Sequence, residues 1–273
     1  NSHTAPGQIP RPTPQGLLTA RVRHQIRYAA THNPHSSVEK TPMSYVIAPP
    51  AISSVPVVGA TDLFRVHRSC CGGRNYEEHA KEMGFTGREP PFFFMKPADA
   101  ILAVQQGDTG NMPYPTLTSN LHHEIELVVA IGKGGKNIPA AQAAQHIYGY
   151  AVGLDMTRRD LQNEMKKQGR PWCIGKGFDH SAPIGPITPA AQAGDVENAA
   201  IWVQVNGVDR QRSTVSQLIW NIAETIEHLS AAWELQPGDL VYTGTPAGVA
   251  AVGSGDVLEG GVEGLGTLRI RMV

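Results

Sequence analysis

The chain has 273 residues, with 23 lysines and arginines against 24 aspartates and glutamates, which gives a formal net charge of −1. This balance, without a basic run, excludes an electrostatic case for binding nucleic acid or an anionic membrane surface. Hydrophobic residues make up 41% of the chain, but no apolar stretch approaches the ~18 residues that span a bilayer. The composition predicts a compact, loop-rich soluble protein of one large domain, or at most two.

The first 42 residues differ from the rest of the chain. Residues 1–42 hold five basic side chains, one acid and six prolines, and such a segment buries too little apolar surface to offset its ordering entropy. We expect a poorly structured N-terminal extension or a cloning remnant, with Met43 as a natural start. The three cysteines make no disulfide framework, which indicates a cytoplasmic location. Mitochondrial import stays open, because a basic, acid-poor segment also fits a transit peptide.

Beyond that segment the pattern predicts an α+β protein that is mostly β. Apolar runs bounded by turn residues are typical of strands, and apolar residues at helical spacing indicate helices. Strands and helices do not alternate regularly, which disfavours a doubly wound parallel sheet. Asn206-Gly207 predicts a hairpin turn. The expected strands lie at residues 44–58, 121–132, 147–154, 199–205, 240–242 and 264–273, and the expected helices at 75–84 with Asn75 as N-cap, at 157–169 with Thr157 as N-cap, and at 217–235.

Three carboxylates stand where an acid needs a partner. Glu124 and Glu126 lie two residues apart at the start of an expected strand and therefore share a face. Asp155 ends the apolar run that reaches Leu154. Like charges this close repel unless a cation lies between them, and three oxygen ligands without a thiolate suit Mg²⁺, Mn²⁺ or Ca²⁺ rather than zinc. A solvated strand edge for the glutamates and a helix cap for Asp155 are the alternative.

A histidine and a glutamate offer acid–base chemistry. His79 and Glu82 are three residues apart on an expected helix, so their side chains can touch. A carboxylate beside an imidazole orients the ring and raises its basicity, as a general base for water requires. An ordinary surface pair is the alternative. The chain has no Walker A motif, no G-x-S-x-G elbow, no H-E-x-x-H and no C-x-x-C, so the usual marks of P-loop NTPases, serine hydrolases and zinc sites are missing.

Further polar groups could bind anions. Lys176 lies in a glycine-flanked segment with almost no charge around it, where it meets an anionic intermediate or reaches solvent. Arg159 and Gln162 share one face of an expected helix. The segment Thr243–Pro246 follows a strand and offers hydroxyl and amide donors for a carboxylate, or is a plain strand-to-loop turn.

Several motifs follow one another in a specific order between about Val57 and Val273. They are Arg74-Asn75-Tyr76-x-x-His79-x-x-Glu82, Phe94-Met95-Lys96-Pro97, His123-Glu124-Ile125-Glu126-Leu127, Gly149-Tyr150-x-x-x-Leu154-Asp155-Met156-Thr157-x-Arg159-Asp160-x-Gln162, Lys176-x-Phe178-Asp179, Val205-Asn206-Gly207, Pro237-Gly238-Asp239 and Thr243-Gly244-Thr245-Pro246-x-Gly248-Val249. This string resembles the fumarylacetoacetate hydrolase family. Within the family it is most similar to the short acylpyruvase branch, and residues 153–162 and 178–185 resemble the fumarylpyruvate hydrolases.

The resemblance implies a mixed β-sandwich roll with peripheral helices, a homodimer, and residues 43–273 as one catalytic domain. It implies Mg²⁺ as cofactor, with Mn²⁺ or Ca²⁺ as substitutes. By matching positions it assigns metal ligands to Glu124, Glu126 and Asp155, catalytic roles to His79, Glu82, Lys176 and Gln162, and substrate binding to Arg74, Arg159 and Thr245.

The implied activity is hydrolysis of a C–C bond in a small 2,4-diketo acid. The longer fumarylacetoacetases add a fourth metal carboxylate shortly before the histidine, but here no acid occurs between Leu63 and Tyr76. This departure favours fumarylpyruvate, cleaved to fumarate and pyruvate in gentisate-type aromatic degradation, over fumarylacetoacetate. No nucleic-acid or membrane partner is implied.

Two other activities stay open on the same scaffold. An oxaloacetate decarboxylase or a keto–enol tautomerase would need the metal site but not the water-activating base. A non-catalytic binder of small dicarboxylates would keep the metal site and release no product, although the intact His79–Glu82 pair argues against it.

Overall fold

The computed structural model describes residues 45–82, 84 and 88–273, with the side chain of Glu82 excepted. The N-terminal segment 1–42 lies outside the described residues. Pro50–Val273 form one compact unit, and the assignment of residues 43–273 to a single catalytic domain stays a prediction. Within the described ranges, no helix has the length and apolar character needed to cross a membrane.

The described part of the chain is mostly β-structure, as the sequence predicts. The strands are β1 Ser54–Pro56, β2 Leu63–Arg65, β3 Arg68–Gly73, β4 Phe92–Lys96, β5 Ile101–Ala103, β6 Thr109–Met112, β7 Leu121–His122, β8 Ile125–Ile131, β9 Ile147–Leu154, β10 Thr157–Arg158, β11 Ala182–Ile184, β12 Thr188–Pro189, β13 Ala200–Val205, β14 Val208–Thr214, β15 Asp239–Tyr242, β16 Ala251–Val252, β17 Val257–Val262 and β18 Gly266–Met272. The α-helices are α1 Glu77–Glu82, α2 Arg159–Lys167, α3 Cys173–Lys176 and α4 Ile222–Ala232, and short 3₁₀ helices lie at Ala98–Ala100, Ala140–His146, Ala190–Gln192, Val196–Asn198 and Val215–Gln217.

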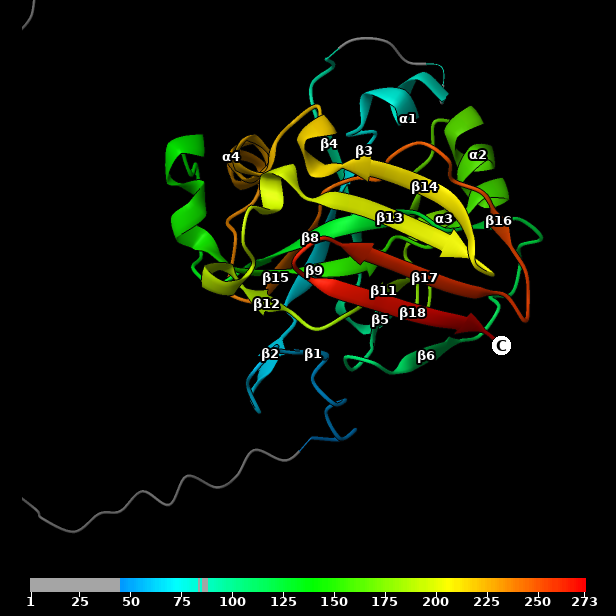
Figure 1. Ribbon diagram of the computed structural model, residues 1–273, viewed down its shortest axis with the longest axis horizontal. Coiled ribbons are helices and arrows are strands. Elements are labelled where there is room, and N and C mark those ends of the chain that lie inside the picture. Colours follow the sequence, from blue (N-terminus) through cyan, green and yellow to red (C-terminus); the bar gives the residue numbers. More distant parts are fainter. Residues whose placement is uncertain (1–44, 83, 85–87) are drawn as a thin grey trace, which may run out of the picture. The chain divides into compact units, whose positions relative to one another are not determined.

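Two sheets carry the architecture. The larger is a curled eight-stranded sheet in the order β4-β3-β15-β8-β9-β11-β5, with β12 paired to β9, and the smaller is a five-stranded sheet in the order β14-β13-β17-β18-β6. Most neighbours are antiparallel, but β15 with β3, β11 with β5 and β18 with β6 are parallel. In Figure 1 the smaller sheet lies in front of β8, β9 and β11, and α1 and α2 lie near one another above it. The prediction of a mixed, mostly β roll is confirmed.

The strand period of two divides the side chains of β8 between two cores. Ile125 and Leu127 pack in the main core with buried side chains of β13, β17 and β18. Val128 and Ala130 point to the opposite face and pack in a second cluster with side chains of β3, β11 and β15. Glu126 shares that second face, because successive strand residues alternate. The side chain of Glu126 therefore does not lie between the two sheets.

The expected strand at 121–132 is interrupted, and the expected helix at 217–235 is shorter than predicted. The strand breaks at residues 123 and 124, because β7 pairs with β10 and β16 whereas β8 pairs with β9 and β15. The helix begins only after Asn221, whose side chain accepts a hydrogen bond from the Glu224 amide while the Glu224 carboxylate accepts one from the Asn221 amide. The hairpin at Asn206-Gly207 is confirmed, with φ of 53° and 77° at the two turn residues.

Asn75 does not cap a helix as expected, since α1 begins at Glu77. Its side chain is buried, donates through Nδ2 to the carbonyl oxygens of Trp220 at 2.9 Å and Thr243 at 2.8 Å, and accepts from the Trp220 amide at 2.8 Å. One side chain thus joins the end of β3 to the segment before α4 and to the segment after β15.

We expect Asn75→Ala to lower the free energy of unfolding by about 2–3 kcal/mol, because the Trp220 amide and the Thr243 carbonyl lose their partners in a buried place. Urea denaturation monitored by tryptophan fluorescence measures this loss. The control is Asn221→Ala, which removes one exposed helix cap and should cost about 1 kcal/mol. Equal losses in the two variants would contradict the bridging role of Asn75.

Candidate active site

The pairing of β8 with β9 brings the three predicted metal carboxylates together. Ile125 lies opposite Leu154 in the register, so the residues next to this pair, Glu124 and Asp155, also meet. The Asp155 amide donates to the Glu124 carbonyl oxygen at 2.9 Å. One carboxylate oxygen from each of Glu124, Glu126 and Asp155 lies within 4.8 Å of the other two, and all three side chains are buried.

The carboxylate cluster fits a divalent cation. Burial, followed by the charges of Asp155 and Glu124, raises the pKa of Glu126 well above its usual range. Oδ1 of Asp155 is buried and forms an ion pair with Lys96 Nζ at 2.8 Å, but it has no well-oriented hydrogen-bond donor among the described residues. A cation would remove the repulsion and use the remaining lone pairs. A donor set of carboxylates alone suits a hard cation.

Three cationic side chains surround these carboxylates. Lys176 Nζ donates to Glu124 Oε2 at 2.8 Å and to Asp155 Oδ2 at 2.7 Å. Arg159 donates to the other oxygen of Glu124 through Nη2. Lys96 is fully buried and forms its ion pair with Asp155. Three bases thus lie beside three acids, and the ion pairs are made by Glu124 and Asp155.

Lys176 stays protonated in this environment. Burial works against its charge, but Asp155 and Glu124 raise the pKa of Lys176. Burial likewise opposes ionisation of Glu124, but Lys176 and Arg159 hold the pKa of Glu124 well below its usual range. The third hydrogen bond of Lys176 Nζ goes to Thr157 Oγ1 at 2.7 Å. Thr157 is therefore not the helix cap that the sequence predicts, and α2 begins at Arg159 without a side-chain cap.

One pocket collects most of the predicted site residues. His79 of α1 is 5% exposed and lies close enough for its charge to lower the pKa of Glu124. The side chain of Glu82, its predicted partner, lies outside the described residues. The pocket is lined by Gly72, Gly73, Arg74, His79, Phe94, Glu124, Glu126, Asp155, Arg159, Gln162, Lys166, Trp172, Lys176 and Thr245.

Gln162 can donate a hydrogen bond to a ligand, whereas Thr245 can only accept one. Gln162 Oε1 accepts from Arg159 Nη1 at 2.6 Å, which leaves the Nε2 group of Gln162 as a donor for a ligand. The Thr245 hydroxyl already donates to the Ile125 carbonyl and accepts from Gln211 Nε2, each at 2.8 Å, so it can offer a ligand a lone pair only. The Gly244 amide donates to a carboxylate, as the sequence of the turn predicted. The acceptor is the protein's own Glu126, at 2.8 Å, and not a ligand.

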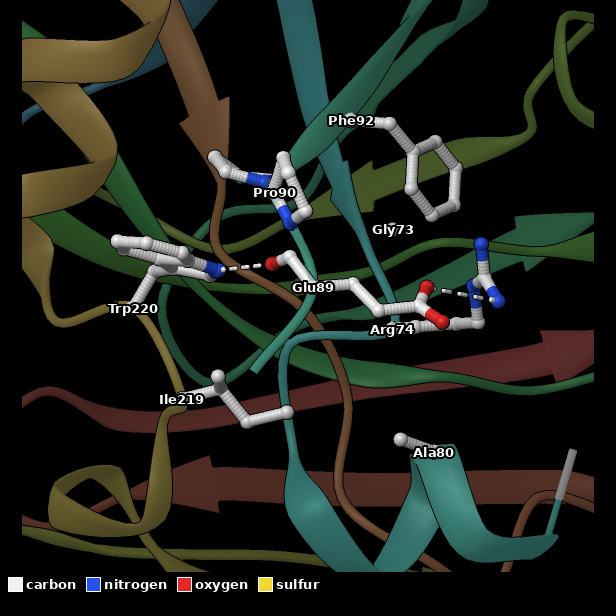
Figure 2. A pocket seen from close by; sticks show the side chains of 9 residues that line it. Gly73, Arg74, Ala80, Glu89, Pro90, Phe92, Ile219 and Trp220 are labelled. Atoms are coloured by element: carbon white, nitrogen blue, oxygen red, sulfur yellow. Dashed lines mark hydrogen bonds and ion pairs between the residues drawn. The ribbon is translucent and has the colours of Figure 1, made fainter. Parts of the chain in front are cut away.

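Arg74 lies at the junction of this pocket with a second one (Figure 2). Its backbone is left-handed, with φ of 54°, a conformation that costs free energy in a non-glycine residue. Its guanidinium lies 4.7 Å from the ring centre of Phe92 and forms a loose ion pair with Glu89, Nη1 to Oε2, at 3.7 Å. The ring can lie there because the preceding residue is Gly73, where a Cβ would lie 2.1 Å from Phe92 Cζ.

Two lysines near the carboxylates or in the pocket received no role from the sequence. Lys96 ends the apolar strand β4, and a charge at the end of such a strand is the same signal that singled out Asp155. Lys166 follows Gln162 by four residues and Arg159 by seven, which is the spacing of one helical face. Both features are present in the sequence, but the structure is needed to show that these lysines lie next to the carboxylates or the pocket.

Comparison with known proteins places the chain in a family. Residues 68–273 match the family described as fumarylacetoacetate (FAA) hydrolase C-terminal. A crystal structure of fumarylpyruvate hydrolase from Pseudomonas aeruginosa in complex with Mn²⁺ and pyruvate has a TM-score of 0.83 and 57% sequence identity, and the match covers 84% of this chain and 99% of that chain.

Two curated relatives have different activities. A fumarylpyruvate hydrolase of Ralstonia sp is 48% identical over 182 residues, which are 67% of this chain and 92% of the relative. A mitochondrial oxaloacetate tautomerase of Rattus norvegicus is 40% identical over 202 residues, which are 74% of this chain and 90% of the relative. With a family match over most of its length, the mixed β-roll and the buried acidic triad, the chain belongs to the fumarylacetoacetate hydrolase family of enzymes.

Proposed function

We propose that this chain is a metal-dependent C–C hydrolase that cleaves a 2,4-diketo acid, with fumarylpyruvate, split to fumarate and pyruvate, as its substrate. The observation that carries the proposal is the placement of His79 in one pocket with three buried carboxylates and a protonated lysine. The fumarylpyruvate hydrolase of Pseudomonas aeruginosa, at 57% identity, supports this substrate.

The charge of the site supports an anionic substrate. Glu124 and Asp155 form ion pairs with Lys96, Lys176 and Arg159. A bound divalent cation, for which we propose Mg²⁺ with Mn²⁺ or Ca²⁺ as substitutes, would add two positive charges, polarise the carboxylate and 2-oxo groups of the substrate and stabilise enolate charge. A 2,4-diketo acid supplies the matching negative charge through its carboxylate and its enolate.

The side chains of the pocket would then divide the reaction between them. A ring nitrogen of His79, oriented by Glu82, takes a proton from water, whose oxygen forms a bond to the distal carbonyl carbon. Gln162 Nε2 donates to the oxyanion that forms there, because its carbonyl oxygen is occupied by Arg159. This step places negative charge where a donor is already oriented.

Collapse of the oxyanion breaks the C–C bond and leaves its electron pair on the pyruvate fragment as an enolate. One of the three hydrogen bonds of Lys176 Nζ would pass to the enolate oxygen. The proton that His79 took from water returns to the enolate carbon, which gives pyruvate, and the acyl fragment leaves as a carboxylic acid. Arg74, Arg159 and Thr245 would hold the substrate at its charged and polar ends.

Action on oxaloacetate is the second candidate, and the oxaloacetate tautomerase of Rattus norvegicus, at 40% identity, favours it. Decarboxylation or keto–enol exchange of oxaloacetate uses the cation and Lys176 but needs no activated water. The role of His79 therefore separates the two functions.

The setting of the enzyme is part of the same proposal. We propose that the enzyme is a homodimer in the cytoplasm and takes part in aromatic degradation. Its proposed partner is the small diketo acid substrate, without nucleic acid or membrane. The mitochondrion is the alternative location, because the oxaloacetate tautomerase of Rattus norvegicus is mitochondrial.

We expect His79→Ala to lower kcat for pyruvate release from fumarylpyruvate by roughly 10²- to 10⁴-fold, the range of a general base, in an assay coupled to lactate dehydrogenase. Glu78→Ala is the matched control, since Glu78 lies on the same helix with an exposed side chain and outside the site pocket. This control should keep its activity within about twofold.

Two results would refute the hydrolase. One is the absence of pyruvate release by the wild type at any metal concentration. The other is a His79→Ala variant that cleaves fumarylpyruvate as fast as the wild type. Turnover of oxaloacetate that survives His79→Ala, measured as CO₂ release or enol absorbance, would establish the second candidate instead.

Removing divalent metal with EDTA is expected to abolish turnover, and adding back Mg²⁺ or Mn²⁺ to restore it. At a metal concentration about 100-fold above Kd, binding should stabilise the fold by about 2.7 kcal/mol, or roughly 5–10 °C in Tm for a chain of this size. Differential scanning fluorimetry measures this shift without reference to activity.

Glu126→Gln is the variant that isolates the metal site. Because burial, Asp155 and Glu124 raise the pKa of Glu126, the neutral glutamine should fold as stably as the wild type in EDTA and keep an acceptor for the Gly244 amide. The metal-dependent rise in Tm should disappear. A variant that keeps the full rise would show that Glu126 is not a ligand.

A further inference from the structure

One face of α2 lines the pocket along its length. Arg159, Gln162 and Lys166 follow one another at intervals of three and four residues and all three line the pocket. Lys167, the next residue, has an exposed side chain and is not part of the lining. The two adjacent lysines of α2 are therefore in different surroundings, although they are chemically identical.

Lys166 belongs to a second group of charges, apart from the balanced centre around the carboxylates. Burial, followed by the charges of Arg74 and Arg159, lowers the pKa of Lys166. Arg159 is engaged by Glu124, whereas Arg74 lies at the junction with the neighbouring pocket. Two cations, Lys166 and Arg74, thus line the wall of one pocket, where their charges attract an anionic group of a ligand.

The acid paired with Arg74 is suited to be displaced. Glu89 reaches toward Arg74 from the segment before β4, as Figure 2 shows, but its ion pair is long at 3.7 Å and its side chain is 54% exposed against 21% for Arg74. The backbone of Glu89 is held separately, because its carbonyl oxygen accepts from Trp220 Nε1 at 3.1 Å. The carboxylate can therefore turn to water while its segment stays in place.

We propose that Lys166 and Arg74 form a binding site for a second carboxylate at the far end of the acyl group, and that the enzyme therefore selects acylpyruvates whose acyl part is itself an acid. Without such a substrate, the Glu89 carboxylate lies in this position and pairs with Arg74. The proposal rests on the proposed C–C hydrolase and names its acyl specificity.

The test compares fumarylpyruvate, whose acyl group ends in a carboxylate, with acetylpyruvate, whose acyl group is neutral. The quantity measured is the ratio of the two kcat/KM values for pyruvate release with Mg²⁺. We expect Lys166→Met, which keeps the length of the side chain, to lower this ratio roughly 10- to 100-fold, chiefly through KM for fumarylpyruvate, which is the range of a charged hydrogen bond.

Two further variants serve as controls. Lys167→Met, on the adjacent residue outside the pocket, should leave the ratio within about twofold. Lys166→Arg keeps the charge and should restore the ratio to within about fivefold of the wild type. A Lys166→Met variant with an unchanged ratio, or a Lys167→Met variant with the same loss, overturns the proposal.

Glu89→Gln provides a test that does not depend on how well Lys166→Met folds. Removing an exposed ion pair that competes for Arg74 should raise the ratio by about two- to fivefold. An unchanged or lowered ratio would show that Glu89 does not occupy the site of the acyl carboxylate.

Binding separates failure of this proposal from failure of the hydrolase. If the wild type cleaves both diketo acids and Lys166→Met leaves the ratio unchanged, the hydrolase stands and the carboxylate site fails. If the wild type cleaves neither, the hydrolase fails, and calorimetry decides the site. Fumarate should then bind at least tenfold more tightly than crotonate, its monocarboxylate counterpart, and Lys166→Met should remove the difference. Equal binding of the two acids to the wild type would overturn the site as well.

Discussion

The repulsion among three buried carboxylates is the constraint on which the rest of the site depends. Glu124, Glu126 and Asp155 lie within 4.8 Å of one another away from water, and ionised acids at that distance need compensating charge. Lys96 and Lys176 contribute from β4 and α3, and an arginine contributes from α2. Each of these basic side chains thus brings its own strand or helix next to the carboxylates, and the pocket lies where these elements meet.

Two features of the carboxylate cluster are not compensated by these three bases. Burial and its two acidic neighbours raise the pKa of Glu126, and Oδ1 of Asp155 has no well-oriented hydrogen-bond donor among the described residues. A hard divalent cation answers both features, and it leaves the centre with a positive charge that an enolisable diketo acid can neutralise. Beyond that centre, Arg74 and Lys166 add positive charge at the other wall of the pocket. Two separate regions of positive charge fit a substrate with acid groups at both ends.

Two of the local errors in the predicted fold share one cause. Asn75 and Thr157 have the residue types and spacing of helix caps, but their side chains bond to partners far away in the sequence, Asn75 to Trp220 and Thr243, and Thr157 to Lys176. A capping interaction contributes about 1 kcal/mol, so a buried long-range hydrogen bond to a charged or otherwise unsatisfied group competes with it successfully. Asn221, an exposed residue without such a competitor, does cap its helix.

Short-range spacing in the sequence was enough to predict that Glu124 and Glu126 lie close together and that the fold is mostly β with a hairpin, and the order of the motifs indicated the family. The sequence by itself could not determine which strand ends meet. Asp155 joins the glutamates only through the register of β8 with β9, and the charge of Lys96 is explained only by its contact with Asp155. These contacts span from about thirty to sixty residues, and they are decided by which strands and helices pack together to bury the two cores. Short-range periodicity carries no information about that choice.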